Sequence, residues 1–180
     1  MKYTVITTFH PAGLKQYAQT MIDSFEQYWP KSVDLVSYAE DCNPQVTRTK
    51  VVDLLSASPD LVEFKRQHQN NPVANGTVAK DTNVPFKDNQ FKWDAVRFAH
   101  KVYSIFHCTT VCNADILIWM DADTVCHSPI NMFTINRLCP PEKDLCFLGR
   151  ERKFSECGLY AMNLRSLSVK LFLERFQYFY

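Results

Sequence analysis

Two aspartates one residue apart follow an apolar run in the second half of the sequence. The run Ile116-Leu-Ile-Trp-Met120 leads directly into Asp121-Ala-Asp123. Side chains two apart in an extended segment point the same way, and carboxylates that close each need a cation, a proton or water beside them. Mg²⁺ and Mn²⁺ prefer such hard oxygen ligands. The pattern therefore predicts a divalent-cation site at Asp121 and Asp123.

The metal site is not the only interpretation of these aspartates. Acidic residues after a strand can also simply begin a turn or cap the next helix. Here the apolar run that precedes them does not alternate with polar residues, which is typical of a strand buried on both faces. A buried strand that ends in two carboxylates favours the metal site.

The elements that must position the aspartates follow a strand, helix, strand order. Residues 3–9 predict a first strand, 14–29 a helix that Pro30 ends, and 33–38 a second strand. Such a unit implies parallel strands with helices packed on them. Later elements are expected over 89–107 (helix), 115–120, 145–148 and 159–162 (strands), and 165–180 (helix). We expect an α/β fold: a single Rossmann-like domain with a mostly parallel central sheet flanked by helices.

The segment between about 43 and 88 has a looser pattern. It holds two short helical candidates, 46–56 and 59–68, and then a stretch that predicts a loop. Such a long excursion is either a binding loop over the site or an insertion without a role.

In a parallel sheet, ligands bind where the strands end, so Thr8, Glu40 and the two aspartates are expected to share one crevice.

Composition excludes several other classes of site. The four glycines, at positions 13, 76, 149 and 158, form neither dinucleotide-binding nor P-loop fingerprints. The formal charge of +1 predicts no general attraction to nucleic acid or anionic membranes. No apolar run suggests a signal peptide or a membrane span, and an odd number of cysteines, seven, favours reduced thiols. We expect a cytoplasmic protein.

One competing interpretation uses the same aspartates. An apolar run followed by Asp-Ala-Asp-Thr-Val resembles the first motif of haloacid dehalogenase-type phosphatases, in which Asp121 would be the nucleophile and Asp123 the acid/base. That family also needs a later lysine and an acidic pair. After Asp123 the only aspartate is Asp144, and the motif falls late in the chain, so this interpretation ranks lower.

The order of segments resembles that of GT-A-type, nucleotide-sugar-dependent glycosyltransferases. The segments that carry the resemblance are Thr7-Thr8-Phe9, Tyr38-Ala39-Glu40, the helix Phe91-Lys-Trp-Asp-Ala-Val-Arg-Phe-Ala-His-Lys101, Asp121-Ala-Asp123 and Ser155-Glu-Cys-Gly158. The resemblance implies a UDP- or GDP-sugar donor, a glycan or other hydroxyl acceptor, and Mn²⁺ or Mg²⁺. A catalytically inactive interaction module with this fold is the third hypothesis.

The resemblance also implies a role for each matching residue. Thr8, Phe9 and Glu40 would contact the base or ribose, and Asp121 the ribose or the metal. Asp123 would be the main metal ligand. Arg97 or Lys101 would neutralise the donor phosphates, or else form a solvated helix face.

Two further residues concern the acceptor and the metal. In an inverting enzyme Glu156 would be the general base; otherwise it is a loop carboxylate paired with Arg150, Arg152 or Lys153. These enzymes often add a histidine ligand near the C-terminus, but the last histidine here is His127. His127 is either that ligand or a surface turn residue.

We expect one domain over residues 1–180, with the donor-binding part over about 1–128 and the acceptor-side part over about 129–180. The aromatic end Phe176-Gln-Tyr-Phe-Tyr180 either packs on the sheet, mediates self-association, or is covered by further chain in a longer protein.

Overall fold

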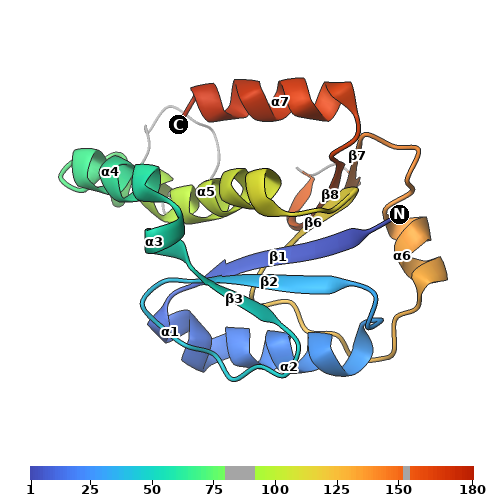
Figure 1. Ribbon diagram of the computed structural model, residues 1–180. Coiled ribbons are helices and arrows are strands. Elements are labelled where there is room, and N and C mark those ends of the chain that lie inside the picture. Colours follow the sequence, from blue (N-terminus) through green and yellow to red (C-terminus); the bar gives the residue numbers. More distant parts are fainter. Residues whose placement is uncertain (80–91, 152–154) are drawn as a thin grey trace.

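A six-stranded sheet runs through the centre of the computed structural model, which describes residues 1–79, 92–151 and 155–180 (Figure 1). The strands are β1 (Tyr3–Phe9), β2 (Asp34–Ala39), β3 (Lys50–Asp53), β6 (Ile116–Met120), β7 (Leu145–Leu148) and β8 (Glu156–Asn163), in the spatial order β3-β2-β1-β6-β8-β7. The pairs among β3, β2, β1 and β6 are parallel, whereas β8 is antiparallel to both β6 and β7. The expected α/β architecture with a mostly parallel sheet is confirmed.

Strand β6 shows why the apolar run carries no polar residue. Its five residues are all buried, and they alternate between two hydrophobic cores. Ile116, Ile118 and Met120 pack into one core, while Leu117 and Trp119 pack into the other. A strand covered by helices on both faces needs apolar side chains at every position.

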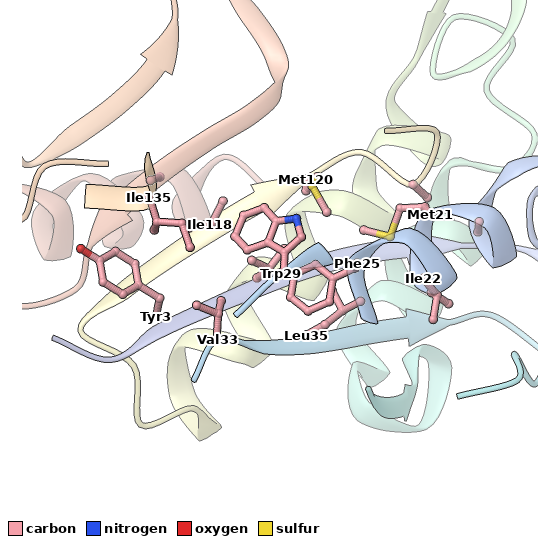
Figure 2. Packing of buried hydrophobic residues seen from close by; sticks show 14 of the residues in the cluster. Tyr3, Met21, Ile22, Phe25, Trp29, Val33, Leu35, Ile118, Met120 and Ile135 are labelled. Atoms are coloured by element: carbon pink, nitrogen blue, oxygen red, sulfur yellow. The ribbon is translucent and has the colours of Figure 1, made fainter. Parts of the chain in front are cut away.

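One core lies between the sheet and a helical segment that runs from residue 11 to 28. The segment consists of α1 (Pro11–Gly13), a π-helical stretch (η1, Leu14–Ala18) and α2 (Gln19–Tyr28). It begins three residues earlier than expected, because proline suits a first helical position and the ring of His10 accepts the amide N–H of Gly13 (3.3 Å). Figure 2 shows Phe25 stacked on Trp29 against the sheet, their ring centroids 4.9 Å apart. Helix α6 (Met132–Leu138), which the sequence did not predict, adds Ile135 to this core.

The second core lies under the helices drawn above the sheet in Figure 1. They are α3 (Leu54–Ala57), α4 (Pro59–His68), α5 (Ala95–Val111) and α7 (Leu167–Tyr178). Helix α5 begins six residues later than expected, since the Asp94 carboxylate caps it by accepting the Arg97 amide N–H (2.8 Å).

The predicted helix over 46–56 is wrong. Lys50–Asp53 forms strand β3 at the edge of the sheet, and only the single turn of α3 after it is helical. The two β-branched residues Val51 and Val52 suit a strand. Asp53 then ends the strand and caps α3 by accepting the Ser56 amide N–H (3.0 Å). Within 43–88, β4 (Asn75–Ala79) pairs with β5 (Lys92–Asp94) in a separate two-stranded sheet, and residues 80–88 lie outside the described residues.

Part of the aromatic C-terminal end packs on the rest of the fold, which was one of the three expectations for this segment. Phe176 and Tyr180 contact the second core, and the Tyr103 hydroxyl donates to the main-chain oxygen of Tyr180 (3.0 Å). Tyr178 and Phe179 are exposed. Self-association through this end stays a prediction. No helix in residues 1–79, 92–151 and 155–180 is long and apolar enough to cross a membrane.

Candidate functional site

A cleft of about 680 Å³ lies where β1, β2 and β6 end. The predicted donor-site residues all line it: Thr8, Phe9, Glu40, Arg97, Lys101, Asp121 and Asp123. The sequence reasoning missed other lining residues, among them Tyr17, Lys65, Asp94, His100, Trp119 and Cys157. The cleft falls in the size range of small-molecule sites, and the carboxyl ends of parallel strands bring its walls together.

Asp121 is held firmly by its neighbours. Its Oδ1 accepts from the Trp119 indole N–H (2.5 Å) and from the Lys101 ammonium (3.1 Å). Its backbone N–H donates to the Gly158 carbonyl (2.7 Å), which ties the end of β6 to β8. The other oxygen, Oδ2, would lie 3.3 Å from a Cβ on Gly158. Glycine at 158 therefore leaves space beside the one Asp121 oxygen that has no hydrogen bond from the described residues.

Lys101 reaches Asp121 from the middle of α5 and is itself largely buried. Its ammonium also donates to the Cys157 carbonyl (2.6 Å) and lies over the rings of Trp119 and Tyr160, 4.6 and 5.3 Å from their centroids. The Lys101 side chain is 18% exposed. Burial, followed by the nearby charge of Asp121, raises the pKa of Tyr160, so that ring remains a neutral phenol.

Asp123 has the opposite environment, although it is only two residues away. It is exposed, and its carboxylate has no hydrogen bond or ion pair from any described residue. The intervening Ala122 is buried, and the Thr124 amide N–H donates to the Asp121 carbonyl (3.0 Å) in a turn. The two aspartates thus present one constrained and one unpartnered carboxylate to the cleft.

Glu40, which follows β2, is in contact with basic side chains from two helices. Lys65 of α4 donates to its Oε1, and His100 Nε2 of α5 lies 3.2 Å from its Oε2. These contacts, the hydrogen bond from His100 first, outweigh burial and lower the pKa of Glu40 to about 2. The His100 Nδ1 lies 2.9 Å from the Arg97 carbonyl and must carry a proton there, because a carbonyl only accepts. Glu40 therefore joins α4 and α5 over the end of β2.

The remaining predicted donor-side residues differ in how much they offer a ligand. The Thr8 hydroxyl donates to the Tyr38 carbonyl (2.9 Å), and Phe9 is only 4% exposed, so its ring belongs mainly to the core. Tyr17, which lies beside them, is half-buried. Arg97 is exposed, and its guanidinium has no ion-pair partner in the described part of the chain.

Glu156 is the first residue of β8 and does not belong to the residues that line the cleft. It forms an ion pair with Arg150, and its Oε1 accepts the Gly158 amide N–H (3.1 Å). That oxygen would lie 3.3 Å from a Cβ on Gly158, as Asp121 Oδ2 would. Glu156 and Asp121 therefore border the same small space. Residues 152 and 153, its other possible partners, lie outside the described residues.

The described residues fit a divalent cation that arrives with ligands of its own. Within 1–79, 92–151 and 155–180, no group of three or more His, Cys, Asp or Glu side chains could hold a metal. His127 is exposed and does not line the cleft. At the end of β6 the cleft offers the carboxylate of Asp123 and Oδ2 of Asp121. Magnesium-like ions are commonly held by one or two carboxylates together with water and substrate phosphates.

Solved structures of glycosyltransferases share this fold. Mouse xyloside xylosyltransferase 1 in its apo form aligns with a TM-score of 0.56 at 8% identity, over 96% of this chain and 72% of that one. The apo form of GlyE from Streptococcus pneumoniae TIGR4 aligns with a TM-score of 0.50 at 10% identity, over 97% of this chain but 37% of GlyE. No protein-family model and no curated protein matches the sequence. The GT-A-type fold expected from the sequence is thus confirmed over nearly the whole chain.

Proposed function

We propose that the protein transfers a sugar from a nucleoside-diphosphate-sugar donor to a hydroxyl acceptor with the help of Mn²⁺ or Mg²⁺. The observation that carries the proposal is the cleft itself. Carboxylates from the end of β6 and basic side chains of α5 line the same cleft, in a fold shared with glycosyltransferases. A donor diphosphate uses both kinds of group. The carboxylates hold the metal ion that also binds the phosphate oxygens, and the basic side chains neutralise phosphate charge directly.

The phosphate side of the donor would lie near Asp121, Asp123 and Arg97. Asp123 and Asp121 Oδ2 would hold the metal, which when bound supplies Lewis-acid stabilisation of the charge that develops on the departing diphosphate. The exposed guanidinium of Arg97 can donate two parallel hydrogen bonds to phosphate oxygens. Lys101 donates to Asp121 and Cys157, so one N–H of its ammonium remains for a phosphate.

The nucleoside would lie at the ends of β1 and β2. Thr8, Phe9 and Tyr17 border that part of the cleft. Glu40 would accept from a ribose hydroxyl, because a carboxylate has about four acceptor positions and the contacts with Lys65 and His100 leave some of them free. Since both helices are already joined through Glu40, this wall is organised before a ligand binds.

The acceptor would approach from the β8 side. In an inverting reaction the proton of its hydroxyl would pass to Glu156, which borders the space at Gly158 together with Asp121. Arg150 and the Gly158 amide hold the Glu156 carboxylate in place. The proposal for Glu156 applies only to that stereochemical outcome.

Thermal unfolding with combinations of ligands tests the donor site. UDP or GDP together with Mn²⁺ should raise the melting temperature by more than the sum of the two separate shifts. Asp123→Ala should abolish this synergy with little loss of stability, because the side chain is exposed and unpartnered. Asp144→Ala, which removes an exposed aspartate outside the cleft, is the matched control and should keep it.

Two results would contradict the proposal. Absence of synergy with UDP, GDP and ADP alike would eliminate the donor site. Hydrolysis of p-nitrophenyl phosphate that depends on Asp121 would instead support a phosphatase, in which that residue is the nucleophile.

A further inference from the structure

The Lys101 ammonium already provides a positive charge beside one of the two aspartates, Asp121. It is 3.1 Å from Asp121 Oδ1 and is fixed there by the Cys157 carbonyl and by two aromatic rings. Four separate contacts on a side chain that is 18% exposed define one position rather than a mobile surface charge. Asp121 is therefore neutralised by the protein itself.

This position has a consequence for any metal at the same aspartates. A divalent ion held by Asp121 Oδ2 and Asp123 would share the Asp121 carboxylate with a fixed positive charge. Like charges a few ångströms apart disfavour each other, and even at the dielectric constant of water the effect of a unit charge on a divalent ion is on the order of tenfold in affinity. The described residues offer no third acidic ligand that would offset it.

We propose that Lys101 is a built-in counter-ion of Asp121, which keeps the affinity for free Mn²⁺ low and makes metal binding conditional on a diphosphate. The inference rests on the proposed function, since it takes the donor diphosphate as the partner. The negative charge of the diphosphate offsets the repulsion between Lys101 and the metal, and the remaining N–H of Lys101 can bond to a phosphate oxygen. Metal and nucleotide therefore bind with positive coupling.

Substitution of Lys101 tests the proposal by a gain of binding. Lys101→Met should bind Mn²⁺ alone about tenfold more tightly than the wild type, measured by isothermal titration calorimetry and by the electron paramagnetic resonance signal of free Mn²⁺. Damage to the site or to the fold would weaken binding, so a gain cannot arise from misfolding. Lys101→Arg, which keeps the charge, should retain the weak affinity of the wild type.

Lys65→Met is the matched control for the loss of a cleft lysine. Lys65 is also paired with a carboxylate, but with Glu40 rather than with a metal ligand. Its removal should leave the affinity for Mn²⁺ alone unchanged. An equal gain in both variants would mean that the net charge of the cleft, and not the position of Lys101, sets the metal affinity, and would overturn the proposal.

A second titration, with UDP present, separates this inference from the proposed function. UDP should tighten Mn²⁺ binding at least tenfold in the wild type and distinctly less in Lys101→Met. If UDP leaves the wild-type affinity unchanged, the donor site and the diphosphate step are both refuted. If UDP tightens binding but Lys101→Met binds free Mn²⁺ no better than the wild type, the donor site stands and the role of Lys101 is refuted.

Discussion

The substitution Glu40→Gln removes the charge that joins α4 and α5 at the cleft while preserving the shape of the side chain. In the wild type, Lys65 and His100 both contact the Glu40 carboxylate. The glutamine would leave these two cation-forming side chains without their anionic partner, and their own exposures are only 30% and 17%. We expect a less stable protein and a less ordered cleft wall.

The pKa of Glu40 gives the magnitude. The pKa falls from its usual 4.5 to about 2, which corresponds to roughly 3 kcal/mol of stabilisation when the carboxylate is charged. Solvent reaches Lys65 more than Glu40, so screening reduces this to about 2 kcal/mol. A carboxyl group whose pKa is lowered by folding stabilises the protein above its unfolded-state pKa. The contribution is therefore complete above about pH 4.5 and is lost as the pH falls toward 2.

Urea unfolding of the wild type and of Glu40→Gln at pH 7 and at several values between 5 and 2.5 measures this contribution. The variant should be about 2 kcal/mol less stable at pH 7, and the difference should shrink as the pH falls through the window. Glu26, whose pKa is also lowered to about 2, affects both proteins equally, so the difference isolates Glu40.

Glu63→Gln on α4, the helix that carries Lys65, is the control. Hydrogen bonds from Arg66 lower the pKa of Glu63 to about 2 as well, but its side chain is 48% exposed and that of Arg66 67%. Such a pair is screened by water, and we expect no measurable loss of stability. If Glu40→Gln is as stable as the wild type, or if the loss does not depend on pH, the pairing of Glu40 with Lys65 and His100 is not what supports this wall.

Two further substitutions examine the space beside Asp121 and the anchor of α2. Gly158→Ala would place a methyl group 3.3 Å from the carboxylate oxygens of Asp121 and Glu156; it should weaken joint binding of Mn²⁺ and UDP at least tenfold by calorimetry and change the unfolding free energy by less than about 1 kcal/mol. Arg48→Met removes three hydrogen bonds to carbonyls at and after the end of α2 and the guanidinium over the Phe25 ring; it should cost about 2 kcal/mol in urea unfolding, and unchanged stability would contradict the anchoring role.

Most strands could be predicted from short clusters of apolar, β-branched and aromatic residues. β1, β2, β6 and β7 lie at or within one residue of their predicted bounds. Only β6 is an unbroken apolar run that is buried at every position, whereas β7 is a largely exposed edge strand whose four residues are all apolar. The edge strand β3 did not leave such a run. It has only four residues and is partly exposed, and so its two valines fitted a helical pattern equally well.

The location of the site followed from topology, but its internal contacts did not. Parallel strands end at one edge, so Thr8, Glu40 and Asp121 had to lie near one another. The partners of these residues come from helices. The hydrophobic periodicity of the sequence does not define how each helix is rotated relative to the sheet. Lys65 on α4 and His100 on α5 could have been sought as the basic residues on the helix faces that lie toward the cleft. Nothing in the sequence distinguished Lys101, which is largely buried, from Arg97, which is exposed.

The different environments of the two aspartates explain how like charges can coexist at the end of a buried strand. Trp119 packs in the second core, and its indole N–H donates to the carboxylate of Asp121, two residues further along the chain. Helix α5 packs on the same face of the sheet as Trp119, and its Lys101 ammonium contacts Asp121. Asp121 is thereby compensated before any ligand binds, whereas Asp123 remains exposed and uncompensated. The pair presents to an incoming ligand about one net negative charge rather than two. One net negative charge attracts a free divalent cation only weakly. A cation that arrives bound to a diphosphate already has phosphate oxygens as ligands, so it does not require a stronger negative charge from the protein.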